Sequence, residues 1–81
     1  MDVTIQIEKT NMTDIKPKQT GQRIKQYRLK AGLSQGGLAK KAGMNTNAYA
    51  KIERGESEPT SATLTKLAKA LNLVVSDLLG A

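Results

Sequence analysis

Glycines and helix-capping residues divide the chain beyond residue 20 into short segments, and this punctuation limits the folds that it can adopt. Gly32, Gly43 and Gly55 each follow a run of residues with helical character, and a Ser, Asn or Thr precedes the next run. Glycine ends helices because it adopts left-handed backbone conformations at little cost, while Ser, Asn and Thr begin helices by accepting hydrogen bonds from free N–H groups. The pattern predicts a compact all-α domain of short helices joined by tight turns.

The sequence predicts five helices, at about residues 20–31, 35–42, 45–53, 60–72 and 75–79. The fourth is the plainest, because its apolar residues recur at the i, i+3, i+4, i+7 spacing of one helix face; they are Leu64, Leu67, Ala68 and Leu71. Aromatic residues make up only 2% of the chain, and Trp and Phe are absent. We therefore expect residues 20–81 to form one domain with a core of Leu, Ile, Val, Ala and Met.

Residues 1–19 form an N-terminal extension with a different pattern. Val3, Ile5 and Ile7 alternate with polar residues, which is the periodicity of a β-strand, and Pro17 interrupts the pattern further on. Because a single strand is not stable alone, the extension is either disordered or a strand that pairs with a second chain or with the edge of the domain. No basic region precedes an apolar stretch, so the extension does not have the pattern of a signal peptide.

The chain carries a net charge of +6, and the whole excess lies in residues 20–81. A basic domain of this size favours a polyanionic partner. Cys and His are both absent, which argues against disulfides, thiol chemistry and most metal sites, and removes the usual general base of catalysis at neutral pH. We expect no metal, no cofactor and no enzymatic activity. No apolar run approaches the roughly 20 residues of a membrane span, so we also expect a cytoplasmic protein without a membrane partner.

The segment from Gln35 to Ile52 has the residue types of a helix-turn-helix. Ala39 lies where the two predicted helices cross, where a larger side chain would push them apart. Gly43 permits the tight turn between the helices, and Met44 fills the space beneath that turn. Further apolar residues face inward from both helices: Leu38, Ala42, Tyr49 and Ile52. Such a motif holds the start of its second helix outward on a rigid platform.

That outward helix start carries side chains suited to reading DNA: Asn45, Thr46, Asn47 and Lys51. Asn forms paired hydrogen bonds with adenine, Thr bonds a base or contacts a thymine methyl group, and Lys binds guanine or phosphate. Asn45 has a second role open to it, that of a helix N-cap alone. Ser34 and Gln35 open the preceding helix, whose free N–H groups are suited to a phosphate. Lys40 and Lys41 form either a basic pair facing the DNA backbone or a solvated helix face.

Three stretches carry a family resemblance: Arg28-Leu29-Lys30-Ala31-Gly32-Leu33-Ser34-Gln35, Leu38-Ala39-Lys40-Lys41-Ala42-Gly43, and Ile52-Glu53-Arg54-Gly55 followed by Pro59. From about Gly21 to Leu79 the chain resembles the lambdoid phage repressor and Cro family, also called the xenobiotic-response-element family. The resemblance implies a five-helix lambda-repressor-like domain that binds double-stranded DNA as a two-fold dimer, with a recognition helix at about residues 45–53 in the major groove. It places Gln35, Asn45, Thr46, Asn47 and Lys51 at the DNA-contacting positions of the family, and Arg54 near the DNA backbone.

The resemblance also implies a structural ion pair between Arg28, late in the first helix, and Glu53, at the end of the third. We expect this pair to be partly buried, and an ordinary surface pair is the alternative. The chain departs from the family pattern at Gly36 and Gly37, which occupy a helix turn where glutamates are common and which cost roughly 1 kcal/mol each relative to Ala. It departs again at Val74, which replaces the usual capping Ser, so the last helix is expected to fray. The N-terminal extension lies outside the family core.

The predicted function is that of a transcriptional repressor, bacterial or phage-encoded, that binds a palindromic operator as a homodimer. Four apolar residues near the C-terminus are candidates for the dimer interface, with the core as the alternative: Leu73, Val74, Val75 and Leu78. The alternative function is an antitoxin, in which residues 1–19 bind a toxin protein while the domain represses the promoter that the two share. An alternating apolar segment is suited to extending the sheet of another protein. A restriction-modification controller and a phage lysogeny protein are further possibilities on the same fold.

Overall fold

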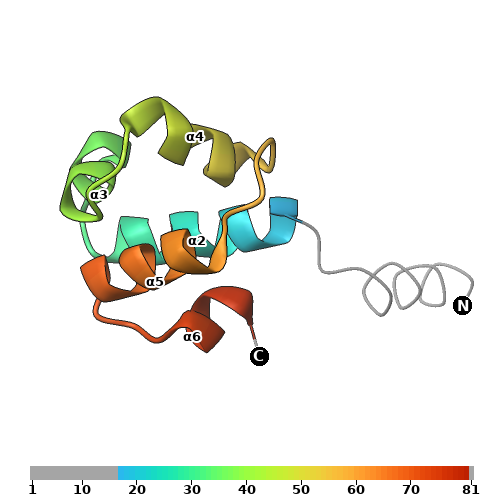
Figure 1. Cartoon of the computed structure of the whole chain (residues 1–81). Coiled ribbons are helices and arrows are strands. Elements are labelled where there is room, and N and C mark those ends of the chain that lie inside the picture. Colours follow the sequence, from blue (N-terminus) through green and yellow to red (C-terminus); the bar gives the residue numbers. More distant parts are fainter. Residues whose placement is uncertain (1–16, 81) are drawn as a thin grey trace, which may run out of the picture.

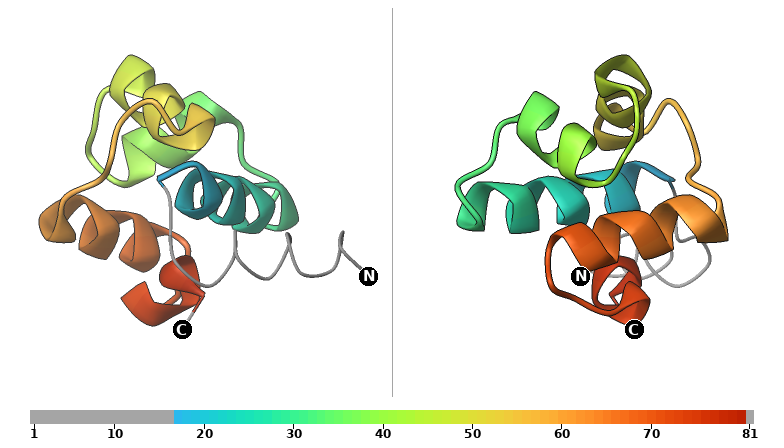
Figure 2. Two further views of the ribbon diagram at one scale, coloured as in Figure 1. Left: turned by 90° about the vertical axis from the view of Figure 1, so that its right-hand side faces the viewer. Right: turned by 60° about the vertical axis from the view of Figure 1, so that its left-hand side comes forward.

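The structure, a computed structural model, describes residues 17–80, and that part of the chain contains five helices and no strand (Figure 1). The helices are α2 (Pro17–Lys30), α3 (Gln35–Lys41), α4 (Thr46–Arg54), α5 (Ser61–Ala70) and α6 (Val75–Leu79). The views in Figures 1 and 2 show α3 and α4 on one side of α2, with α5 and α6 on the other. The prediction of an all-α fold of five short helices is confirmed.

Helices α3, α4 and α5 begin directly after the predicted capping residues Ser34, Asn45 and Thr60. Ser34 Oγ accepts a hydrogen bond of 2.9 Å from the Gly37 N–H, and Thr60 Oγ1 accepts one of 3.1 Å from the Thr63 N–H. The first helix begins at Pro17 rather than at residue 20, because proline lacks an N–H group and has a fixed φ that suits a first helical turn. The expected boundary after residue 19 thus falls inside α2, and the expected strand over Val3–Ile7 lies outside the described residues.

The core lies between the two layers of helices. Each of the five helices contributes one of its largest fully buried side chains, which are Ile24, Leu38, Tyr49, Leu67 and Leu78. Ala39 is also fully buried, as expected for a small residue at a helix crossing. Leu78, a candidate for the dimer interface, belongs to this core, so the core alternative holds for it. Among residues 17–80, no helix is long and apolar enough to cross a membrane.

The backbones of α2 and α4 meet at Gly21. A Cβ atom built on Gly21 would lie 2.1 Å from the carbonyl oxygen of Ile52 and 2.8 Å from that of Glu53. Both oxygens belong to the main chain of α4, so neither can rotate away as the end of a side chain can. Any larger residue at position 21 must push the two helices apart.

We expect Gly21→Ala to lower the free energy of unfolding by about 1–3 kcal/mol or more, the usual cost of overpacking a well-packed site. Gly36→Ala is a matched control, because the nearest atom to its Cβ would be Thr46 Oγ1 at an ordinary 3.7 Å. Replacing a helical glycine with alanine at an open site raises stability by roughly 0.5–1 kcal/mol. Urea unfolding followed by circular dichroism measures both variants, and equal effects would contradict the close approach at Gly21.

Candidate DNA interface

The turn between α3 and α4 sets the angle at which α4 is presented. It is closed by backbone hydrogen bonds from the Gly43 N–H to the Lys40 oxygen, at 3.0 Å, and from the Met44 N–H to the Ala39 oxygen, at 2.9 Å. Gly43 has a φ of +72°, and a Cβ atom there would meet nothing within 4 Å. The glycine is therefore required by the left-handed backbone conformation rather than by lack of space. Met44 packs against the core beneath the turn, as the sequence suggests.

The first turns of α4 expose a row of polar side chains. Thr46, Asn47 and Lys51 are all exposed, and among residues 17–80 none of their side chains hydrogen-bonds to another residue. Asn45 is exposed too, but its Oδ1 accepts hydrogen bonds from the backbone N–H groups of Asn47 and Ala48, at 2.8 and 3.2 Å. The N-cap role of Asn45 is therefore filled, and only its amide NH₂ group is left to face a ligand.

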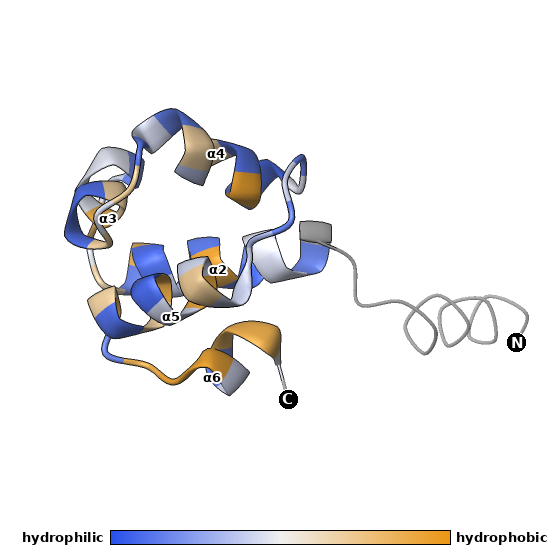
Figure 3. Ribbon diagram, viewed as in Figure 1, coloured by the Kyte–Doolittle hydropathy of each residue, from blue (hydrophilic) through white to orange (hydrophobic). Residues whose placement is uncertain are grey.

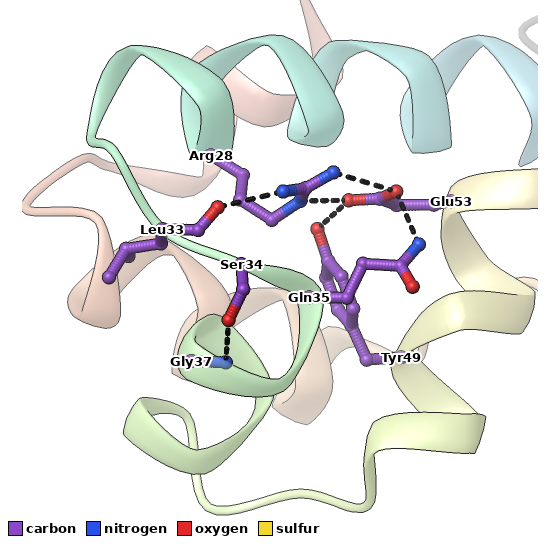
Figure 4. Close-up of polar contacts among 7 residues, drawn as sticks. All are labelled: Arg28, Leu33, Ser34, Gln35, Gly37, Tyr49 and Glu53. Atoms are coloured by element: carbon purple, nitrogen blue, oxygen red, sulfur yellow. Dashed lines mark hydrogen bonds and ion pairs between the residues drawn. The ribbon is translucent and has the colours of Figure 1, made fainter.

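Gln35 opens α3, but its amide nitrogen turns toward the interior rather than toward solvent. Its Nε2 donates a hydrogen bond of 2.9 Å to Oε1 of Glu53, and the residue is half-buried (Figure 4). Ser34, in contrast, is exposed and uses its hydroxyl oxygen to cap α3. The sequence marked both residues for a phosphate contact and gave no sign that Gln35 belongs to a network inside the protein.

The network centres on the carboxylate of Glu53, which is buried together with Arg28. Arg28 Nε lies 2.5 Å from Glu53 Oε2, and the two side chains are only 9% and 4% exposed. The remaining side of the Arg28 guanidinium donates to the Leu33 carbonyl oxygen at 2.7 Å, and the Tyr49 hydroxyl donates to Glu53 Oε2. Figure 4 shows these groups converging from α2, from the turn after it, from α3 and from α4. The pair thus joins α2 to α4 inside the protein, and Gln35 extends this clamp to α3, so it is not an ordinary surface pair.

The protonation states in this network follow from its contacts. Burial alone would raise the pKa of Glu53, but hydrogen bonds from Arg28, Tyr49 and Gln35 outweigh that effect and hold the pKa below its usual value. Burial and the hydrogen bond to Glu53 raise the pKa of Tyr49, so its hydroxyl remains a donor. The hydrogen bond to Glu53 also raises the pKa of Arg28. At neutral pH, one anion therefore accepts from one cation and two neutral donors.

A second ion pair, between Arg54 and Glu56, lies on the surface at the C-terminal end of α4. Arg54 Nε is 2.8 Å from Glu56 Oε2, and Arg54 Nη2 is 3.1 Å from Glu56 Oε1. Both side chains are slightly more than half exposed. The sequence marked Arg54 for the DNA backbone and left Glu56 without a role.

A family model described as helix-turn-helix matches residues 24–78, which include all of α3 and α4. The chain belongs to the helix-turn-helix family. The resemblance to lambdoid phage repressors is confirmed by a relative: over 60 residues the chain is 42% identical to the immunity repressor protein of Bacillus phage phi105, covering 74% of this chain and 42% of that protein. The chain therefore spans less than half the length of this repressor. It is also 34% identical over 56 residues to an uncharacterized HTH-type transcriptional regulator of Archaeoglobus fulgidus, covering 69% and 80% of the two chains.

Two solved structures share the fold. The restriction-modification controller protein C.AhdI from Aeromonas hydrophila superposes with a TM-score of 0.75 at 32% identity, over 76% of this chain and 94% of that one. The clp gene regulator ClgR from Corynebacterium glutamicum gives 0.74 at 25% identity, over 78% and 67% of the two chains. The chain thus shares its helix-turn-helix domain with proteins that are regulators.

We expect Arg28→Met and Glu53→Gln each to lower the free energy of unfolding by about 3–5 kcal/mol, because each leaves the other member of the pair buried without its partner. Since the pKa of Glu53 is lowered by folding, its contribution to stability is present above the usual Glu pKa of about 4.3 and is lost as the pH falls through the lowered value.

Thermal melts between pH 7 and pH 2 measure both effects. Glu53→Gln should remove the part of the acid destabilisation that the wild-type chain owes to this carboxyl group. Unchanged midpoints in both variants at neutral pH would show that the pair adds nothing to stability.

Proposed function

We propose that the chain is a transcriptional repressor that binds a palindromic operator as a homodimer and inserts α4 into the major groove. The observation that carries this proposal is the row formed by Thr46, Asn47 and Lys51, exposed and without partners in the described part of the chain. Each of these side chains can bond a base edge, and all three stand on a helix that the Glu53 network holds rigidly.

The geometry supports different DNA contacts for the remaining residues. Asn45 would contact DNA only through its amide NH₂ group, because its oxygen caps α4. Ser34 precedes α3, Gln35 is its first residue, and Arg54 is the last residue of α4. These positions suit the phosphate backbone on either side of the groove. Lys40, exposed on α3, would add a phosphate contact that carries no sequence information. A repressor acts by occupying such a site, and the similarity to a phage immunity repressor favours this sign of regulation.

We place the dimer contact at α6. Val74, which precedes the helix, is 62% exposed and Leu79 at its end is 37% exposed, while Leu73 and Val75 pack partly against the core. In Figure 3, α6 and the segment leading into it form one of the most apolar stretches of the ribbon. Two domains joined by a two-fold axis near α6 would place their α4 helices in major grooves about one helical turn apart, centre to centre.

Selection of bound duplexes from a random library, at low and near-physiological salt, tests the proposed function. We expect an inverted repeat that survives the higher salt. Asn47→Ala should then relax the preference at one base pair by about 1–3 kcal/mol, because a base contact carries sequence information. Lys40→Ala is the control, and it should weaken all duplexes alike and flatten the salt dependence. Recovery of only salt-sensitive, featureless sequences would contradict specific recognition.

We expect Val74→Ser to weaken dimerisation without destabilising the domain. The Val74 side chain offers no hydrogen-bond acceptor at the N-cap of α6, where the Asp77 carboxylate accepts from the Val74 N–H at 3.1 Å. Serine would add the missing cap, commonly worth about 0.5–2 kcal/mol, while removing exposed apolar surface. Leu29→Ser is the control, since Leu29 on α2 is similarly exposed, at 53%. Sedimentation at several concentrations would count against the α6 interface if the dimer survived Val74→Ser.

A further inference from the structure

Glu56 is held in a fixed place at the end of α4. Gly55 has a φ of +78°, and the Glu56 N–H donates to the Lys51 carbonyl oxygen at 2.9 Å. A left-handed glycine followed by this hydrogen bond is the Schellman type of helix end. The hydrogen bond fixes the direction in which the backbone leaves α4, and it places the Glu56 carboxylate next to the surface that we assign to DNA.

The Glu56 carboxylate faces cations that the proposed function assigns to DNA. Two nitrogens of Arg54 contact its two oxygens, the paired arrangement that a guanidinium also makes with a phosphate. The hydrogen bond from Arg54, and then the charges of Arg54 and Lys51, lower the pKa of Glu56. The carboxylate is thus ionised at neutral pH, and the proposed DNA contact that it hydrogen-bonds is Arg54.

We propose that Glu56 occupies, in the free protein, the place of a DNA phosphate, and that DNA binding transfers Arg54 from this carboxylate to the DNA backbone. The inference rests on the proposed function and adds to it a residue that limits affinity. An exposed ion pair is weak and screened by salt, whereas duplex DNA presents a dense array of phosphates, so the exchange of partners is open to Arg54.

The exchange sets the overall affinity of the domain for DNA and not its choice of sequence. Arg54 would meet the backbone and not the bases, so Glu56 weakens binding to every duplex by the same factor. Base contacts at Asn47 and its neighbours are left untouched. Glu56 therefore lowers the affinity for DNA in general and leaves the ratio of operator affinity to unrelated-DNA affinity unchanged.

The test compares Glu56→Gln with Glu58→Gln by titrating a fluorescent operator duplex and an unrelated duplex at several salt concentrations. Both variants remove one negative charge from the same exposed loop, but only Glu56 contacts Arg54. We expect Glu56→Gln to bind both duplexes about 2- to 5-fold more tightly than Glu58→Gln does. Its plot of log affinity against log salt should be steeper, by less than the value of about 0.9 for a whole phosphate contact, because in the wild-type chain salt also weakens the ion pair that competes with DNA.

The same two substitutions, made in a chain that lacks Arg54, test whether Arg54 is the cation that Glu56 holds. In an Arg54→Gln chain, Glu56→Gln and Glu58→Gln should have the same effect, because the exchange needs the guanidinium. Equal effects of the two substitutions in the wild-type chain, or a surplus effect of Glu56→Gln that persists without Arg54, would overturn the inference while leaving DNA binding intact. A wild-type chain that binds neither duplex would instead overturn the proposed function itself, and the inference with it.

Discussion

The carboxylate of Glu53 determines how α2, α3 and α4 can be arranged. Each of its two oxygens accepts two hydrogen bonds, Oε1 from Arg28 and Gln35 and Oε2 from Arg28 and Tyr49. Taking a carboxylate out of water costs several kcal/mol unless its lone pairs find donors, and here the donors come from three helices. A shift of one of these helices against the others would break at least one of these hydrogen bonds. We infer that the charge specifies geometry, whereas apolar contacts alone, being non-directional, would tolerate sliding between the helices.

The close approach at Gly21 makes this clamp possible. Gly21, Ile24 and Arg28 follow one another at i, i+3 and i+7, so they share the face of α2 that is buried against α4. Because Gly21 has no side chain, the α2 backbone comes against the carbonyl groups of Ile52 and Glu53. The Glu53 side chain can then reach Arg28 farther along the same face. One glycine and one ion pair thus set the position of the recognition helix relative to the rest of the domain.

Features that depend on a residue and its near neighbours in the chain could be predicted from the sequence. The N-caps Ser34 and Thr60, the turn at Gly43 and the small residue at Ala39 all follow from local rules, which act over a few residues. The contact between Gln35 and Glu53 joins residues far apart in the chain, and no local pattern marks it.

Three further features of the structure leave only a weak mark in the sequence, or none. Tyr49 lies four residues before Glu53, a spacing that brings two side chains of a helix together, but an apolar face explains a tyrosine equally well. The requirement at Gly21 appears only once two helices are placed in contact. The Arg54–Glu56 pair depends on the direction in which the chain leaves α4, and that direction is set by the hydrogen bond that follows Gly55.

The hydrogen bond to Glu53 also restricts which donors and acceptors Gln35 can present to DNA. An ionised carboxylate only accepts hydrogen bonds, so the Gln35 amide must turn its nitrogen toward Glu53 and its oxygen away. The outward part of the amide then presents one acceptor and one remaining N–H, not the two donors that a phosphate would bind best. Glu53 therefore stabilises the fold and orients a side chain at the edge of the proposed interface. Because one carboxylate does both, a substitution at Glu53 changes the shape of the DNA-facing surface as well as the stability of the domain.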